Sequence, residues 1–167
     1  MRKVALVVWT LFCVVVALLV VCWGVQQLRR WDPSVGLRLR AWSWAPGLIL
    51  MIGGGFVVLL CGGILGARGF WSTPGERLWP TEFVASGPFR YVRNPMSLGW
   101  VTLMLGLGLY ESSVTVVLSA AALFLLLHLI VVYGEEPGLE KRFGEGYRDY
   151  KRSVNRWIPR FRDKRTK

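Results

Sequence analysis

Long apolar runs divide the 167-residue chain, and polar segments separate them. Residues 4–25 and 47–67 contain no charged side chain, and residues 114–133 are interrupted by a histidine, His128. A helix of about 20 residues crosses a hydrocarbon core about 30 Å thick, so each of these runs is long enough to span it. Residues 95–110 form a fourth, shorter apolar run. The pattern predicts an all-α integral membrane protein with about four transmembrane helices at these positions.

The connecting segments predict how the helices are arranged. Only residues 111–113 separate the last two spans, so we expect these spans to form a tight hairpin. Pro137 is expected to end the last span. Beyond it, apolar residues recur every three or four positions, which is typical of an amphipathic helix at a membrane surface. These residues are Leu139, Phe143, Tyr147, Tyr150 and Val154. No repeat or low-complexity linker interrupts residues 1–167, which predicts a single membrane domain.

Basic residues indicate the orientation of the chain. It has 21 Lys and Arg against 10 Asp and Glu, and 11 of the basic residues follow residue 140. Because cytoplasmic segments of membrane proteins carry an excess of Lys and Arg, we expect both termini on the cytoplasmic side. The clustering favours contact with the headgroups of a lipid bilayer over binding to nucleic acid. Met1-Arg2-Lys3 resembles the start of a signal peptide, but the long apolar run without a clear cleavage site favours a retained helix.

Ionisable side chains near the inner end of the last span are candidates for chemistry. His128 and Glu135 are seven residues apart, so they lie on nearly the same face of a regular helix. An ionisable group within a membrane needs a partner or a cavity, which favours a polar pocket lined by His128 and Glu135. The alternative is a structural role for His128. Glu135 and Glu136 could also simply mark where the helix meets water. The three cysteines lie in apolar runs without metal-ligand spacing, and we expect no metal site.

The stretch before the third span has features of an anion site. Asn94-Pro95 is typical of an N-cap followed by the first helical residue, so the span is expected to begin there. The free amides of a helix start attract anions, and Arg93 stands beside them. Alternatively, Arg90 and Arg93 contact lipid phosphates. With the acidic pair opening on the same side, one pocket has a cationic and an anionic end. S-adenosylmethionine, with its carboxylate, ammonium and sulfonium, belongs to the class of ligand that fits such a pocket.

Two sequence motifs carry a family resemblance. The first is GPFRYVRNPMSLGW at residues 87–100, and the second is EEPGLEKRFGEGYRDYKRSVNRWIP at residues 135–159. They resemble motifs of the membrane methyltransferases that include isoprenylcysteine carboxyl methyltransferase and the phospholipid N-methyltransferases. The second motif is similar to the paired Glu, the FG..Y..Y pattern and the terminal IP of that superfamily. The resemblance covers about residues 80–160 and implies an S-adenosylmethionine pocket formed by the last hairpin and its flanking polar segments.

Site residues follow from matching positions. The resemblance implies cofactor contacts at Glu82, Phe83, Val84, Phe89, Asn94, Pro95, Met96 and Ser97. Arg93 joins them as the anion-binding arginine of the same stretch. Glu135 and Glu136 match the acidic pair that positions cofactor or substrate. We expect Glu136 to contact the cofactor, and Glu135 or His128 to act as the general base for an amine or thiol acceptor.

Three positions depart from the pattern of the superfamily. Asn94 stands where a histidine is usual, and Ser97 replaces an aromatic residue, which opens space near the cofactor. Val131 stands where the prenylcysteine enzymes carry an arginine for the substrate carboxylate. These departures favour a neutral, amine, thiol or lipid-like acceptor over a prenylcysteine carboxylate.

The sequence therefore predicts an S-adenosylmethionine-dependent methyltransferase that acts on a small or lipid-like acceptor at the membrane. One alternative is an NADPH-dependent membrane reductase of the sterol-reductase type, whose last hairpin and tail are similar but whose chains are usually much longer. Another is a non-catalytic scaffold or lipid-binding protein. The oligomeric state is not indicated by the sequence.

Overall fold

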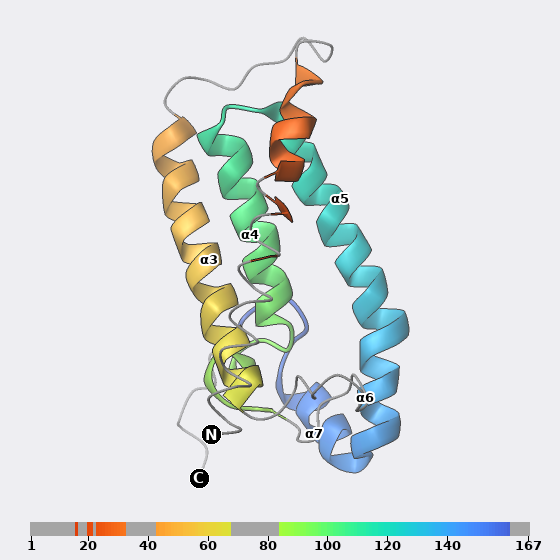
Figure 1. Ribbon diagram of the computed structural model, residues 1–167. Helices are drawn as coiled ribbons and strands as arrows, with labels where there is room; N and C mark the ends of the chain where they lie inside the picture. Colours follow the sequence, from red (N-terminus) through yellow and green to blue (C-terminus); the bar gives the residue numbers. More distant parts are fainter. Residues whose placement is uncertain (1–15, 17–19, 22, 33–42, 68–83, 161–167) are drawn as a thin grey trace.

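The computed structural model describes residues 16, 20–21, 23–32, 43–67 and 84–160, and within these ranges every regular element is helical. Residues 23–29 are helical, and the further α-helices are α3 (Trp44–Ala67), α4 (Pro95–Tyr110), α5 (Val114–Ile130), α6 (Glu136–Phe143) and α7 (Glu145–Ser153). A 3-10 turn, η2 (Gly87–Arg90), precedes α4, and a π-helical segment, η3 (Val131–Glu135), joins α5 to α6. Figure 1 shows α3, α4 and α5 side by side, with α6 and α7 at one end. The predicted all-helical class is confirmed for the described residues.

Two helices are long and apolar enough to cross a membrane. They are α3 and the continuous helix Val114–Phe143, which consists of α5, the π segment and α6. Each contains one of the predicted spans. α4 matches the predicted third span, but its 16 residues make it shorter than the other two. The predicted span at 4–25 lies mostly outside the described residues, so the number of membrane crossings stays a prediction.

Glycines bring α3 and α4 into direct backbone contact. A Cβ atom added at Gly54 would lie 2.7 Å from the carbonyl oxygen of Gly99. One added at Gly106 would lie 2.8 Å from the carbonyl oxygen of Gly47. Small residues allow membrane helices to approach closely, and real Cβ atoms do not tolerate such distances. These glycines therefore set the distance between α3 and α4.

Replacing Gly106 with alanine is expected to loosen this contact. The new methyl group meets backbone atoms of Met51 and Gly47, which cannot move aside by a rotamer change. We expect the free energy of unfolding to fall by about 1–3 kcal/mol, as measured by unfolding in detergent. Gly63→Ala is the control, because within the described ranges no atom lies within 4 Å of a Cβ at Gly63. Equal stability of the two variants would show that α3 and α4 are not in close contact.

A short turn leads from α4 into α5. The side chain of Ser113 accepts a hydrogen bond from the amide of Val116 at 3.2 Å and caps α5. The two helices are in contact and run in opposite directions in Figure 1. At the same end, the amide of Thr115 donates to Asp32 Oδ1 at 3.0 Å, and Ser43 Oγ donates to the carbonyl of Leu109 at 2.8 Å. These contacts tie residues before α3 to the turn.

Pro137 does not end the last long helix, contrary to the sequence prediction. A proline removes one backbone donor and crowds the preceding helical turn. Here the π segment lies immediately before it, and α6 continues from Glu136 to Phe143 with Pro137 in its first turn. The wider π turn accommodates the proline, and it also changes the register of the side chains that follow.

The predicted C-terminal amphipathic helix is divided into two helices, so the prediction of one continuous helix was wrong. Gly144 separates α6 from α7 with a φ of 57°, a conformation that favours glycine. The predicted apolar residues do share one face, but that face packs within the protein. The buried cluster consists of Tyr147, Tyr150 and Val154, with Leu139 and Phe143 packed against it.

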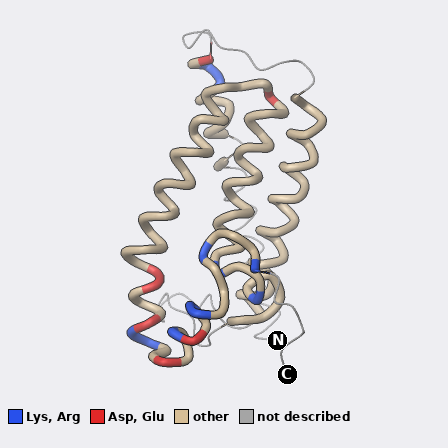
Figure 2. Tube along the Cα trace, turned by 180° about the vertical axis from the view of Figure 1, so that it is seen from behind, with Lys and Arg blue, Asp and Glu red and all other residues tan. Residues whose placement is uncertain are grey.

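Charged residues of the described chain gather at the two ends of the helices, and the long middle carries none (Figure 2). At the end where α4 meets α5, Arg29 Nη1 lies 2.6 Å from Glu111 Oε2. The charges of α6, α7 and the segment before α4 lie at the other end. An uncharged middle between two charged ends fits a chain embedded in a bilayer.

Candidate active site

Glu136 is the centre of a buried group of charges at the end of the molecule where α6 and α7 lie. It is 4% exposed. Arg156 approaches its carboxylate with two nitrogens, Nε at 2.8 Å from Oε1 and Nη2 at 2.8 Å from Oε2. Arg93 Nη1 lies 2.8 Å from Oε1, and Lys151 Nζ lies 3.8 Å from Oε2. We call these four residues the Glu136 cluster. Lys151 is closer to Glu140, at 3.0 Å, so the excess of positive charge comes from the two arginines that share the Glu136 carboxylate.

The carboxyl-terminal segment 154–160, here called the tail, holds this cluster together. The amide of Arg93 donates to the carbonyl of Asn155 at 2.9 Å, and the amide of Arg160 donates to the carbonyl of Tyr91 at 2.8 Å. These two hydrogen bonds fix the tail beside the residues that precede α4. Arg156 lies between the two bonds along the tail and therefore reaches Glu136.

Three buried donor atoms on two residues beside the cluster have no hydrogen-bond partner within the described part of the chain: Nε and Nη1 of Arg93, and Nδ2 of Asn94. Arg93 Nη1 does form the ion pair with Glu136, and the Arg93 side chain also interacts with the Tyr147 hydroxyl. The Arg93 side chain is only 10% exposed. Buried donors in proteins are nearly always paired, so unpaired donors next to excess positive charge indicate a place for an acceptor. The first amides of α4 add to the same preference for an anion.

The first turn of α4 lies where the sequence predicts it. Asn94 is the N-cap residue and Pro95 begins the helix, but the Asn94 side chain makes no capping hydrogen bond. The predicted capping role of this side chain is therefore wrong, and its amide group is available for another partner. Pro95 is buried, and Met96 and Ser97 are half-buried.

The other predicted cofactor residues precede α4. Val84 is buried, and the carbonyl oxygen of Phe89 accepts a hydrogen bond from the Tyr150 hydroxyl at 2.6 Å. This bond ties η2 to α7. Glu82 and Phe83 lie outside the described residues. Contact of any of these side chains with a cofactor stays a prediction.

His128 is bonded to the tail. Trp157 Nε1 donates to His128 Nδ1 at 3.0 Å, and the Phe124 ring packs against Trp157 edge-on with 5.1 Å between ring centroids. An indole N–H can only donate, so the histidine nitrogen that faces it presents a lone pair, and the other nitrogen carries the proton. A general base needs a free lone pair. This hydrogen bond therefore occupies the atom that a catalytic His128 would use.

Trp157→Phe is expected to weaken the attachment of the tail. Phenylalanine keeps an aromatic ring beside Phe124 but leaves His128 Nδ1 without its donor, so the free energy of unfolding should fall by about 1–2 kcal/mol. The change is measured by unfolding in detergent. Trp44→Phe, at an exposed position on α3, is the control and should have little effect. Unchanged stability of Trp157→Phe would refute a contribution from this bond.

Glu135 differs from its neighbour in its surroundings. It is exposed, and within the described ranges it has no ion pair or hydrogen bond. The π segment lies between His128 and Glu135, so their seven-residue spacing no longer superposes them as it does in a regular helix. The structure thus brings Arg93 and Glu136 together, while Glu135 is left accessible at the edge of the cluster.

Sequence reasoning missed the partners of Glu136 and His128, which are Lys151, Arg156 and Trp157. The motif NRWIP was recognised, but nothing in its spacing shows what its side chains contact. The two tyrosines of α7 were assigned to an apolar face and to the FG..Y..Y pattern, without any partner. Burial, with the negative charge of Glu136 next in effect, raises the pKa of Tyr147 to about 12, and burial raises the pKa of Tyr150 as well. Both therefore stay protonated at neutral pH and do not act as bases.

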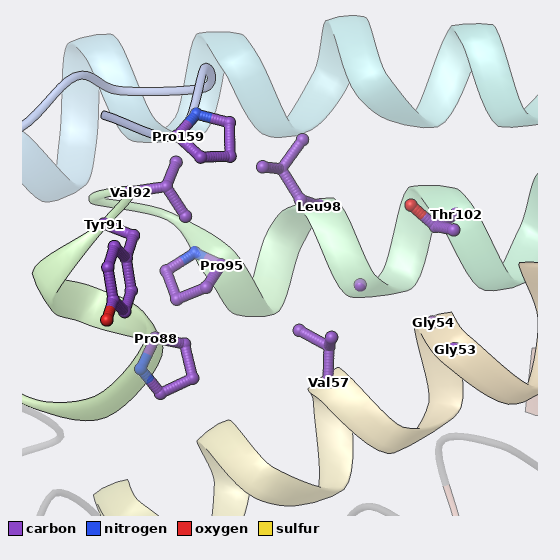
Figure 3. Close-up of a pocket in the computed structure, with 11 residues that line it drawn as sticks. Gly53, Gly54, Val57, Pro88, Tyr91, Val92, Pro95, Leu98, Thr102 and Pro159 are labelled. Atoms are coloured by element: carbon purple, nitrogen blue, oxygen red, sulfur yellow. The ribbon is translucent and has the colours of Figure 1, made fainter. Parts of the chain in front are cut away.

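An apolar pocket of about 340 Å³ lies between α3, the start of α4 and the tail (Figure 3). Its walls come from four segments of the chain. The lining residues are Gly53, Gly54 and Val57 of α3, Pro88, Tyr91 and Val92 before α4, Pro95, Leu98, Gly99 and Thr102 of α4, and Pro159 of the tail. Its volume lies within the range of small-molecule sites, and its walls are almost entirely apolar. The sequence did not predict this pocket.

The described residues form two apolar helices long enough to cross a membrane, a buried group of charges at one end and an apolar pocket beside it, which together are typical of a membrane protein. Residues 42–146 match the model of the phospholipid methyltransferase family. The match covers more than half of the chain, so the chain belongs to this family, and the predicted resemblance is confirmed. No curated protein matches the chain. Membership in the family implies methyltransferase activity at a membrane.

Proposed function

We propose that the protein is an S-adenosylmethionine-dependent methyltransferase whose acceptor is a small or lipid-like molecule at the membrane. Membership in the phospholipid methyltransferase family supports methyl transfer. The observation that carries the cofactor assignment is the Glu136 cluster, with its excess positive charge and its unpaired donors at the start of α4. These groups fit the carboxylate of S-adenosylmethionine.

Different residues of the site bind the cofactor and take part in the reaction. S-adenosylmethionine supplies a methyl group that is bonded to a sulfonium sulfur. The thioether that remains after transfer, S-adenosylhomocysteine, is a good leaving group. Arg93 and the Asn94 amide hold the cofactor carboxylate, and Glu136 keeps the two arginines in place. Glu135, which is accessible, takes the proton from an amine or thiol acceptor. The remaining contribution is alignment of the acceptor and exclusion of water.

The environment of Val131 bears on the acceptor. Val131 is 1% exposed and lies at the start of the π segment. The prenylcysteine enzymes are expected to carry an arginine at this position for the substrate carboxylate. A buried valine offers no charge to a carboxylate, which supports a neutral, amine, thiol or lipid-like acceptor.

The proposal includes an arrangement in the membrane. The chain is a single domain with four spans, the last two of which form a hairpin, and both termini are cytoplasmic. The charged ends and uncharged middle seen in Figure 2 support this arrangement, as does the concentration of Lys and Arg after residue 140. The Glu136 cluster then faces the cytoplasm, where the cofactor is supplied, and the acceptor arrives from the bilayer.

Ligand-dependent thermal stability tests the cofactor assignment. S-adenosylhomocysteine is expected to raise the melting temperature of the purified protein in detergent, because a ligand that binds only the folded state stabilises it. NADPH is expected to have no effect. Stabilisation by NADPH alone would favour a membrane reductase, and stabilisation by neither ligand would favour a scaffold. Arg93→Ala is expected to abolish the shift caused by S-adenosylhomocysteine.

A further inference from the structure

The apolar pocket between α3 and α4 is poorly suited to a charged cofactor. Its walls are apolar, and the Glu136 cluster contributes none of its lining residues. From Pro95 to Thr102 the pocket follows α4 for seven residues, which is about 10 Å at the rise of a helix. A leaflet of the hydrocarbon core is about 15 Å thick, so the pocket covers most of this depth.

The inner end of the pocket lies next to the charged site. Tyr91, Val92 and Pro95 line the pocket, while Arg93, within the same short stretch, turns to Glu136. The tail contributes Pro159 to the pocket and Arg156 to the cluster. The same two segments of the chain therefore bound both sites, so a molecule in the pocket has one end at the level of the cluster.

Gly53 is what leaves the pocket open on the α3 side. It lines the pocket, and no described residue lies within 4 Å of a Cβ placed there. Gly54 and Gly99 in the same walls are already needed for contact between the helices. A larger residue at position 53 would contact none of the described residues, so packing among them does not explain the glycine.

We propose that this pocket holds a hydrocarbon chain of a phospholipid acceptor and thereby positions its headgroup for methylation. This inference rests on the proposed function and assigns the place of the acceptor. The surrounding bilayer is as apolar as the pocket, so occupancy brings no hydrophobic gain. The benefit is positional, because a chain fixed in the pocket keeps the headgroup beside Glu135 and Arg93.

Photolabelling in lipid nanodiscs tests this assignment. The probe is a phospholipid with a diazirine in the middle of one acyl chain, and labelled residues are identified by mass spectrometry. We expect labels on Val57, Leu98 and Thr102 in the wild-type protein, in addition to labels on outward residues such as Ile49 and Phe56. Gly53→Leu, which fills the pocket, is expected to lose the first set and keep the second.

Gly63→Leu is the matched control, since it adds the same side chain to open space on the same helix outside the pocket. It is expected to keep both sets of labels. Val57→Phe fills the pocket from another position and replaces Gly53→Leu if that variant does not fold. Labels only on outward residues, or pocket labels that persist when the pocket is filled, would show ordinary boundary lipid and overturn the assignment.

Different experimental results would refute the proposed function and this inference. Gly53→Leu is expected to keep the stabilisation by S-adenosylhomocysteine while it loses the pocket labels. Absence of stabilisation in the wild type with pocket labels intact refutes the methyltransferase and leaves a lipid-binding pocket. Normal stabilisation without pocket labels refutes the acceptor site alone.

Discussion

Glu136→Gln is expected to lower the free energy of unfolding by about 3 kcal/mol, because it leaves buried cations without their counter-charge. Arg93 is the most affected, since its side chain is 10% exposed and its ion pair is with this carboxylate. Arg156 and Lys151 are more accessible to water, so losing the negative charge of Glu136 destabilises them less. Glutamine preserves the shape of the side chain, so the change in stability reports the charge. Unfolding in detergent, followed by circular dichroism, measures it.

Glu140→Gln is the matched control. Glu140 also pairs with Lys151, at 3.0 Å, and with Arg148, at 2.9 Å, but both of these ion pairs are accessible to water. Exposed pairs typically contribute less than about 1 kcal/mol, so we expect a small effect. A Glu136→Gln variant no less stable than Glu140→Gln would mean that Glu136 does not organise the site.

Glu135→Gln is expected to reduce methyl transfer to an amine or thiol acceptor by about 100-fold or more while the protein remains folded. A positioned general base typically contributes a factor of this size. Glu135 is exposed and has no partner within the described residues, so its loss leaves no buried charge unpaired. The variants of the two adjacent glutamates are therefore expected to differ. Glu136→Gln loses stability, and Glu135→Gln loses turnover.

Turnover with methyl-labelled cofactor measures the effect, and the shift in melting temperature with S-adenosylhomocysteine shows that binding is retained. Glu145→Gln is the control, because Glu145 is an exposed acid on α7 that pairs only with Arg148 and Arg152 in the described chain. It is expected to keep normal turnover. Normal turnover of Glu135→Gln would remove Glu135 from the reaction, and the acceptor would then need no base at this position.

The helices could be predicted from sequence because their signals are local. Apolar runs long enough to span a bilayer predicted most of α3 and α5, and Asn94-Pro95 predicted the start of α4 to the residue. Glycines that bring two helices together are a general feature of helix packing in membranes. Each of these features depends on the composition of one segment and on general preferences of helices in membranes.

The site itself depends on contacts between distant residues. Arg156 is 20 residues from Glu136, and Trp157 is 29 residues from His128, with a π segment, a helix break at Gly144 and the tail in between. The seven-residue spacing placed His128 beside Glu135 because it assumed a regular helix. The preference of proline for helix ends predicted that Pro137 would end the last span. The π segment invalidates both steps. The pocket was missed for the same reason, because its walls come from four separate segments.

Transfer of a labelled methyl group tests the proposed function most directly. The purified protein, in nanodiscs made from lipids of its own membranes, is incubated with methyl-labelled S-adenosylmethionine, and lipids and small molecules are analysed for label. We predict a labelled product with the wild-type protein and none with Arg93→Ala. A folded wild-type protein that binds S-adenosylhomocysteine yet labels no acceptor in these membranes would contradict methyl transfer to a membrane acceptor.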